Sequence, residues 1–248
     1  MKITSINNEI VKETYKLQQR KYRQETGLFL LEGDKCIEEA IEFGLEIKYI
    51  FVLEGYEKFK YSNRIDTTEA VLSKISTTSS APKAVGVGKI LSEKWNNNFK
   101  KIILLENIKD AGNLGTILRT ACAFDIDAII LYGDTVDLYN PKCVRSSVGN
   151  LWKVPVFNVS GINNLKELCM DYTPVATLPK AIDTVWLKDF VPPEKCLIMF
   201  GTESSGLSDE LVRYAKEYGS AVTIKMSDNV ESLNLSASAA IIIHSIYD

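Results

Sequence analysis

The sequence has a single histidine, His244, and its five cysteines form no C-x-x-C pair. A zinc site takes several nitrogen or sulfur ligands, so we expect no metal. No stretch reaches about 18 consecutive apolar residues, and the N-terminal residues lack an apolar signal core. We therefore expect no membrane association and a cytoplasmic protein with reduced, buried thiols. The lone histidine is expected to be structural or interfacial.

The formal net charge of −3 excludes a globally basic nucleic-acid coat, although it is compatible with a local basic patch. With 46% hydrophobic residues, the 248-residue chain can bury a sizeable core and form one large domain or two smaller ones. We predict two domains. Residues 1–92 form the first, the polar and Asn-rich residues 93–100 form a linker, and residues 101–248 form the second.

The pattern of residues 1–92 predicts a small α/β domain. The apolar stripe over residues 5–24 predicts a helix, and "GLFLLEG" and "IKYIFVLEG" predict strands. Between them, "DKCIEEAIEF" predicts a helix that begins near Asp34 and ends at Gly44. "TTEAVLSKIS" predicts a short helix. "KAVGVGKI" predicts a third strand, whose glycines indicate a bulge or a close backbone approach.

From residue 101 onward, apolar strands alternate with helices, which predicts a mostly parallel sheet covered on both faces. Such sheets bind ligands at the carboxyl ends of their strands. The predicted strands are "KIILLE", "DAIILYG", "KVPVFNV" and segments near 174–177, 196–200 and 220–224. The predicted helices cover 114–124, 141–147, 162–171, 208–217 and 233–247.

Three loops that follow strands carry unusual residues: "NLGTILR", "MFGTESSGL" and "IKMSDNVESLNLSASAA". The first loop looks like a nucleotide-binding turn, but Gly112 and Gly115 fit neither G-x-G-x-x-G nor G-x-x-x-x-G-K-[ST]. The sequence therefore lacks the glycine fingerprint of a dinucleotide-dependent oxidoreductase. Taken one at a time, the polar residues have ordinary explanations. Asn113, Ser232 and Asn234 can cap helices, while Arg119 and Glu203 can be solvated.

Together the three loops resemble the SpoU, or TrmH, family of RNA ribose methyltransferases in the SPOUT superfamily. "NPKCVRSSVGNLWKVPV" is similar to a further family segment, and "RKYRQETGLFLLEG" resembles the substrate-binding domain that many members carry. The resemblance covers nearly the whole chain. Its motifs are N-x-G-x-x-x-R at Asn113, Gly115 and Arg119; F-G-x-E-x-x-G-L at Phe200, Gly201, Glu203, Gly206 and Leu207; and I-P-M with S-L-N-V-S at Ile224, Met226, Ser232, Leu233, Asn234 and Ser236.

The resemblance implies an α/β fold with a deep trefoil knot in residues 101–248 and a homodimer formed through that domain. It implies methyl transfer from S-adenosyl-L-methionine to a ribose 2′-hydroxyl of RNA, ribosomal RNA being favoured over transfer RNA. Only RNA offers that hydroxyl. The implied catalytic residues are Asn113, Arg119, Glu203, Ser232 and Asn234, and the implied donor pocket is lined by Thr177, Leu178, Gly201, Ile224, Met226 and Leu233.

Arginine side chains stay protonated in proteins, so we expect Arg119 to hold phosphate and the developing oxyanion and not to act as a base. The RNA-binding residues are expected in "KLQQRKYR", whose tyrosine and its neighbour Tyr15 can stack bases. On composition alone, a solvated helix face is the favoured explanation of this segment. The resemblance of the N-terminal domain to a substrate-binding domain reverses that preference. The residues expected to contact RNA are Lys16, Arg20, Lys21, Arg23 and Arg145.

The sequence departs from the family pattern at three positions. Lys225 and Ala111 stand where proline is common, and Asp228 stands where glycine is common. Lys225 and Asp228 flank backbone that wraps the methyl donor in the family. A non-catalytic RNA-binding protein with a degenerate donor pocket is therefore the alternative function.

Overall fold

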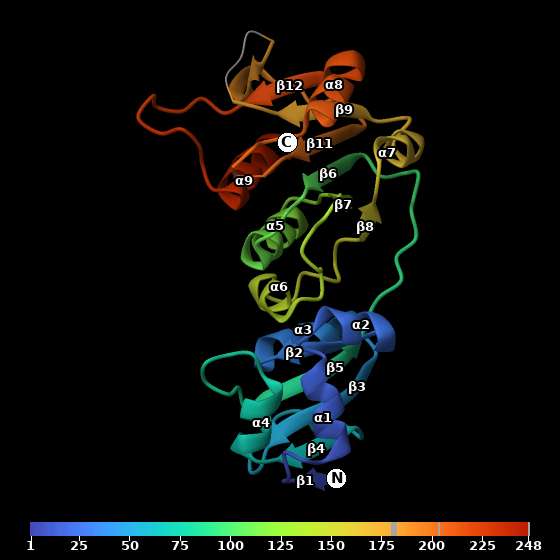
Figure 1. The fold of residues 1–248 in the computed structure, drawn as a ribbon, viewed down its shortest axis with the longest axis vertical. Helices are drawn as coiled ribbons and strands as arrows, with labels where there is room; N and C mark the ends of the chain where they lie inside the picture. The colour runs from blue at the N-terminus through green and yellow to red at the C-terminus, as the bar shows by residue number, and fades with distance from the viewer. Residues whose placement is uncertain (180–182, 203, 248) are drawn as a thin grey trace. The chain divides into compact units, whose positions relative to one another are not determined.

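In a computed structural model, which describes residues 1–179, 183–202 and 204–247, the chain divides into two compact units (Figure 1). The first unit combines Met1–Ser92 with Asp137–Lys153. The second combines Glu93–Val136 with Val154–Asp248. Each unit has its own sheet and its own hydrophobic core.

The first unit is built on a five-stranded sheet with the order β1-β4-β3-β5-β2. Strand β5 runs antiparallel to β2 and β3, and the other pairs are parallel. The glycines of β5 permit the close approach that the sequence indicates, because a Cβ atom on Gly88 would lie 3.0 Å from a methyl of Leu45. The strands are β1 Lys2–Ile3, β2 Leu28–Glu32, β3 Ile47–Leu53, β4 Arg64–Thr67 and β5 Ala84–Lys89.

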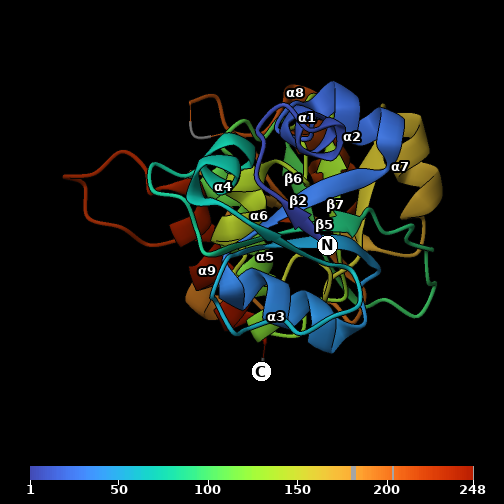
Figure 2. The same cartoon turned by 90° about the horizontal axis from the view of Figure 1, so that it is seen from below.

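Helices α1 and α4 cover one face of this sheet and α3 covers the other (Figure 2). The prediction of one helix over residues 5–24 is wrong, because the chain makes two helices separated by a turn. The side-chain amide of Gln18 donates to the carbonyl of Ser76 at 3.0 Å, beyond the end of α4, and this contact fixes the turn. The helices are α1 Glu9–Lys16, α2 Arg20–Thr26, α3 Asp34–Phe43, α4 Glu69–Ile75 and α6 Pro141–Ser146.

Residues 137–153, which contain α6, pack with the first unit although their neighbours in sequence belong to the second. The guanidinium of Arg23 binds the carboxylate of Asp137 at 2.5 Å, and the Arg23 side chain is 2% exposed. The ring of Tyr139 lies 4.7 Å from that of Phe29. Buried ionic and aromatic contacts of this kind hold the segment against β2 and α2.

The second unit contains a seven-stranded sheet with the order β10-β12-β9-β11-β6-β7-β8. All its neighbouring strands are parallel, which confirms the predicted sheet type. The sequence predicted every strand except the two-residue β10. The strands are β6 Lys101–Glu106, β7 Ala128–Tyr132, β8 Val156–Val159, β9 Thr173–Thr177, β10 Val185–Trp186, β11 Cys196–Phe200 and β12 Ser220–Thr223.

Helices lie on both faces of this sheet (Figure 1). Leu165 of α7 and Leu211 of α8 join a core cluster with alternate sheet residues such as Leu104 and Met199. Helices α5 and α9 pack against each other on the other face. Trp95 and Phe99, in the segment expected as a linker, pack against the core cluster. The helices are α5 Ala111–Ala123, α7 Ile162–Leu168, η1 Leu187–Asp189, α8 Asp209–Tyr218 and α9 Leu235–Ser245.

None of the helices in the described part of the chain combines the length and the apolar character that a membrane span requires.

Candidate functional site

The three unusual loops meet at one edge of the second unit's sheet. They follow strands β6, β11 and β12. Together with β9, these strands are consecutive in the sheet, in the order β12-β9-β11-β6. Because the strands are parallel, their carboxyl ends lie at the same edge. The fold therefore gathers segments that are more than 100 residues apart in sequence.

A cavity of about 410 Å³ opens at this edge, within the range of small-molecule sites. Its walls come from the ends of β9, β11 and β12, from the loops that follow them and from α9. All six residues expected to bind the methyl donor line it: Thr177, Leu178, Gly201, Ile224, Met226 and Leu233. The other described lining residues include Thr202, Ser204, Ser205, Leu207, Glu231 and Ser232.

The loop after β11 folds back tightly on itself. Thr202 and Gly206 exchange two backbone hydrogen bonds of 3.0 and 2.9 Å. Gly206 has a φ of +67°, and a Cβ atom on Gly201 would lie 2.0 Å from the carbonyl carbon of Gly206. Only glycine at position 201 permits this approach. Glu203, expected to act in the site, lies outside the described residues.

Glu106, which the sequence argument did not select, anchors the far end of this loop. It is the last residue of β6 and is 3% exposed. Its carboxylate accepts a 2.7 Å hydrogen bond from the backbone N–H of Ser208, the N-cap of α8. The sequence signal for Glu106 is an acid that directly follows the apolar residues of a strand. Such an acid is expected to be buried, and a buried carboxylate needs a specific hydrogen-bond partner.

The phenol of Tyr132, at the end of β7, makes a second contact with the start of α8. It donates to the Glu210 carboxylate at 3.0 Å. Burial, together with this hydrogen bond, raises the pKa of Tyr132 to about 12. The phenol therefore stays protonated at neutral pH and acts as a structural donor.

The side chain of Asn234 joins the third motif to the first. Its amide oxygen accepts from the backbone N–H of Ser236 at 3.0 Å and so caps helix α9. Its amide nitrogen donates to the side-chain oxygen of Asn113 at 3.1 Å. One residue therefore starts a helix and connects two loops that are 121 residues apart.

Asn113 does not cap α5, so that ordinary explanation of the residue is wrong. Asp110 is the N-cap, and its carboxylate accepts from the backbone N–H of Asn113 at 2.9 Å. The helix consequently begins at Ala111, earlier than predicted. Asn113 lies in its first turn, where the side chain is available to reach Asn234.

Arg119 lies further along α5 than Asn113, by about 9 Å, and is turned from it by about 120° around the helix axis. Its side chain is exposed, and no hydrogen bond or ion pair joins it to another described residue. No residue of α5 is among the described residues that line the cavity. Of these residues, Ser232 alone is among the described residues that line the cavity. Asn113 and Asn234 bind each other at the edge of the sheet, and Arg119 lies outside the cavity without such a contact.

The residues expected to bind RNA divide into two groups. Lys16, Arg20 and Lys21 are exposed on α1 and α2. The ammonium groups of Lys16 and Lys21 lie 5.4 and 5.9 Å from the ring centre of Tyr22. Lys74 of α4 adds a cation 3.9 Å from the ring centre of Tyr15. These residues form a basic and aromatic face on the first unit.

Arg23 and Arg145 are the other group, since both are engaged within the first unit. The prediction that Arg23 contacts RNA is wrong, because its side chain is buried against Asp137 and the carbonyl of Leu17. Arg145 binds the carboxylate of Glu32, whose side chain is 1% exposed, and the hydroxyl of Thr77 at 2.5 Å. A buried acid needs such a cation, which the sequence spacing alone does not reveal.

Within the described part of the chain, no group of three or more His, Cys, Asp or Glu side chains can hold a metal ion. The five cysteines are free thiols. Cys36, Cys143, Cys169 and Cys196 are buried and Cys122 is half-buried. Burial raises the pKa of the Cys169 thiol to about 12 and that of Cys196 to about 11.

Comparison with family models matches residues 100–244 to the SpoU rRNA Methylase family. Residues 8–86 match the MRM3-like substrate binding domain. An uncharacterized tRNA/rRNA methyltransferase of Synechocystis is 31% identical, over 98% of this chain and 92% of that protein. The 23S rRNA (guanosine(2553)-2′-O)-methyltransferase of Bacillus subtilis is 28% identical, over 98% and 97%.

Solved structures are similar over nearly the whole chain. An rRNA methyltransferase from Sinorhizobium meliloti with bound AdoMet aligns with a TM-score of 0.86 at 26% identity, covering 99% of this chain and 96% of that one. An RNA 2′-O ribose methyltransferase aligns with a TM-score of 0.83 at 29% identity, covering 99% and 97%. Both units therefore have folds that occur in solved methyltransferases of RNA.

Proposed function

Because this chain belongs to the SpoU rRNA methylase family, we propose that it transfers a methyl group from S-adenosyl-L-methionine to a ribose 2′-hydroxyl of ribosomal RNA. The observation that carries the proposal is the cavity at the sheet edge, whose walls come from the second and third motif loops. The relatives named for 23S rRNA and the structure solved with AdoMet support the substrate and the donor.

The cavity fits the donor in shape and chemistry. Gly201 allows the loop to close tightly into a wall of the cavity, because a side chain there would collide with the Gly206 backbone. Leu178, Ile224, Met226 and Leu233 offer apolar surface for the adenine ring, and Thr177 stands beside them. The hydroxyl of Thr177 already donates to the carbonyl of Met199 at 2.9 Å, which fixes that wall.

The reaction forms a bond between the ribose oxygen and the methyl carbon while the bond from that carbon to sulfur breaks. Bound donor supplies an electrophilic methyl group and leaves as S-adenosylhomocysteine, while the hydroxyl proton passes to solvent water as the new bond forms. A ribose hydroxyl is a poor nucleophile, so the protein must position it and stabilise the negative charge that develops on oxygen. We assign the positioning to Asn113, Ser232 and Asn234.

Arg119 is proposed to supply the positive charge. Its guanidinium is exposed and forms no hydrogen bond or ion pair with another described residue, so it is available to an RNA phosphate and to the developing oxyanion. Glu203 keeps its proposed role of orienting Arg119 or the motif loops.

The first unit is proposed to hold the RNA through its basic and aromatic face. Lys16, Arg20, Lys21 and Lys74 can neutralise phosphates, while Tyr15 and Tyr22 can stack unpaired bases. Arg145 has weaker support because its guanidinium already binds Glu32. Transfer RNA is the alternative substrate, and a non-catalytic RNA-binding protein is the alternative function that Lys225 and Asp228 motivate.

A homodimer formed through the second unit is part of the same proposal. Ile241 of α9 is 42% exposed and Tyr247 is 44% exposed, and Phe124, the C-cap of α5, packs edge-on against His244 at 5.3 Å. Apolar surface of this kind is typical of subunit interfaces. Light scattering at micromolar concentration is expected to give a dimer mass, and Ile241→Asp a monomer mass. The trefoil knot and a cytoplasmic location also belong to the proposal.

Two measurements test the proposed function. Calorimetric titration with S-adenosyl-L-methionine is expected to show one donor site per chain, and no binding at millimolar donor would favour the non-catalytic alternative. Mapping of ribose methylation in RNA from a strain that lacks the protein, against its parent, is expected to show one missing methyl group in ribosomal RNA. A methyl group missing from transfer RNA instead would replace the proposed substrate.

A further inference from the structure

The donor cavity contains one charged side chain among its described lining residues, that of Glu231. The other described residues of the wall are apolar or carry neutral hydroxyls. Glu231 belongs to the loop between β12 and α9, next to Ser232, and its side chain is exposed. No hydrogen bond or ion pair joins its carboxylate to another described residue.

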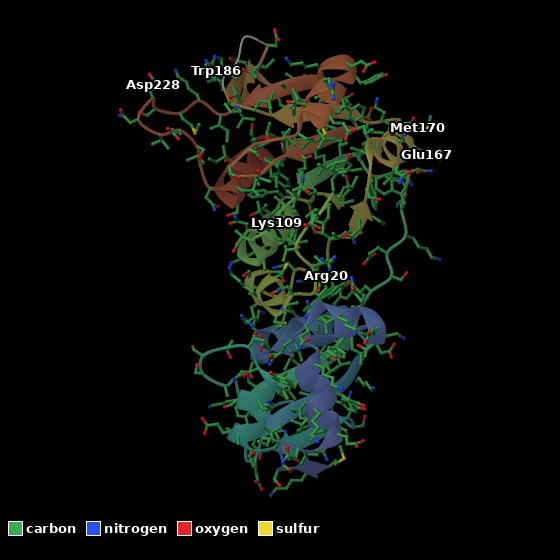
Figure 3. All side chains as sticks on the ribbon, viewed as in Figure 1. Arg20, Lys109, Glu167, Met170, Trp186 and Asp228 are labelled. Carbon is green, nitrogen blue, oxygen red and sulfur yellow. The ribbon has the colours of Figure 1, made fainter. Side chains whose placement is uncertain are left out.

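The remaining charges of this loop are placed differently. Lys225 and Asp228 are exposed and are not among the described residues that line the cavity. Figure 3 shows Asp228 at the tip of the loop, which projects from the body of the second unit. The loop therefore directs one acid into the cavity wall and keeps another away from it, which gives a matched pair for comparison.

The donor and its product differ in charge. S-adenosyl-L-methionine carries a sulfonium and an ammonium against one carboxylate, so its net charge is positive. Loss of the methyl group leaves a neutral thioether, and S-adenosylhomocysteine is a neutral zwitterion. A carboxylate in a cavity wall that is otherwise uncharged attracts the donor more strongly than the product.

We propose that Glu231 is a specificity-determining residue that favours the cationic donor over the neutral product, an inference that rests on the proposed function. Its carboxylate raises the affinity for S-adenosyl-L-methionine and leaves that for S-adenosylhomocysteine nearly unchanged. The exchange of product for fresh donor is thereby promoted after each methyl transfer. A charge pair at contact distance in water-like surroundings changes an affinity about fivefold, which sets the size of the effect.

Calorimetric titration of three ligands into the full-length chain tests this proposal. The ligands are S-adenosyl-L-methionine, S-adenosylhomocysteine and sinefungin, a donor analogue that keeps a positive charge where the sulfonium stands. For Glu231→Gln we expect donor and sinefungin affinities to fall about fivefold and product affinity to change less than twofold. For Asp228→Asn, in the same loop but outside the described lining, we expect the donor-to-product ratio to stay unchanged.

The salt dependence of the unaltered protein provides a second readout that needs no variant. Because salt screens an exposed charge, the donor-to-product affinity ratio is expected to fall between low and molar salt. The proposal would be overturned if Glu231→Gln weakened the binding of donor and product equally. It would also be overturned if Glu231→Gln and Asp228→Asn had the same effect on the donor-to-product affinity ratio. Absence of donor binding to the unaltered protein would instead overturn the proposed function.

Discussion

The amide nitrogen of Asn234 lies 3.1 Å from the side-chain oxygen of Asn113 and donates a hydrogen bond to it. This contact joins the loop that starts α9 to the first turn of α5. The same Asn234 side chain caps α9 through its oxygen. The two functions use different atoms of one amide, so they can be separated by substitution.

Asn234→Asp is expected to keep the cap and lose the donor to Asn113. Thermal unfolding should therefore stay near that of the unaltered protein, while methyl transfer falls in single-turnover assays. Asn234→Ala removes both contacts and should also lower the free energy of unfolding by about 1 kcal/mol. Full activity of the Asp variant would show that the Asn113 contact has no part in the reaction.

Arg119→Ala is expected to fold and to bind S-adenosyl-L-methionine normally, since no residue of α5 is among the described residues that line the cavity. Methyl transfer should fall by about 10² to 10³, the usual cost of removing one charge-stabilising donor. Arg119→Lys keeps the charge but loses the planar fork, so partial RNA binding with slow turnover is expected. Near-normal single-turnover methylation by the Ala variant would refute the assignment.

Gly201→Ala is expected to abolish donor binding. Its Cβ atom would lie 2.0 Å from the Gly206 carbonyl carbon, so the loop that walls the cavity must open. Ser204→Ala, in the same loop, is the matched control and should bind donor nearly normally. Calorimetry with S-adenosyl-L-methionine gives both affinities, and equal affinities would mean that the loop tolerates the added carbon.

Glu106→Ala is expected to weaken donor binding although Glu106 itself does not line the described cavity. It removes the acceptor for the Ser208 N–H and so releases the end of the loop that follows β11. Glu106→Gln keeps an acceptor oxygen in the same place and should recover most of the donor affinity. Tyr132→Phe, which removes the other contact to the start of α8, serves as control. Loss of thermal stability with unchanged donor affinity would leave Glu106 a purely structural role.

Arg145→Ala is expected to destabilise the first unit, because it leaves the Glu32 carboxylate buried without its cation. Since Arg145 is itself 30% exposed, the cost should lie at the low end for broken buried pairs, about 3 kcal/mol. Lys153→Ala breaks the more exposed pair with Glu39 and should cost less than about 1 kcal/mol. Urea unfolding measures both, and Glu32→Gln combined with Arg145→Ala should recover part of the loss.

The sequence by itself determined the longer strands and helices of the second unit and the loops that follow its strands. Strand β11 is a continuous apolar run and β6 is apolar over residues 102–105, which only a sheet covered on both faces can bury, so their pattern is unambiguous. The motif loops follow these strands directly. The resemblance of these loops to the family motifs therefore pointed to residues that line the cavity, without knowledge of the strand order.

Only the tertiary structure decided which distant segments meet. Residues 137–153 belong to the first unit because Asp137 pairs with Arg23 across 114 positions, and no local pattern encodes that pair. The same contact turned a predicted RNA ligand into a buried ion pair. Gln18, Asp110 and Glu106 likewise act through hydrogen bonds to backbone groups. Apolar periodicity records burial along one element, whereas a side chain's hydrogen-bond partner depends on what the folded chain brings beside it.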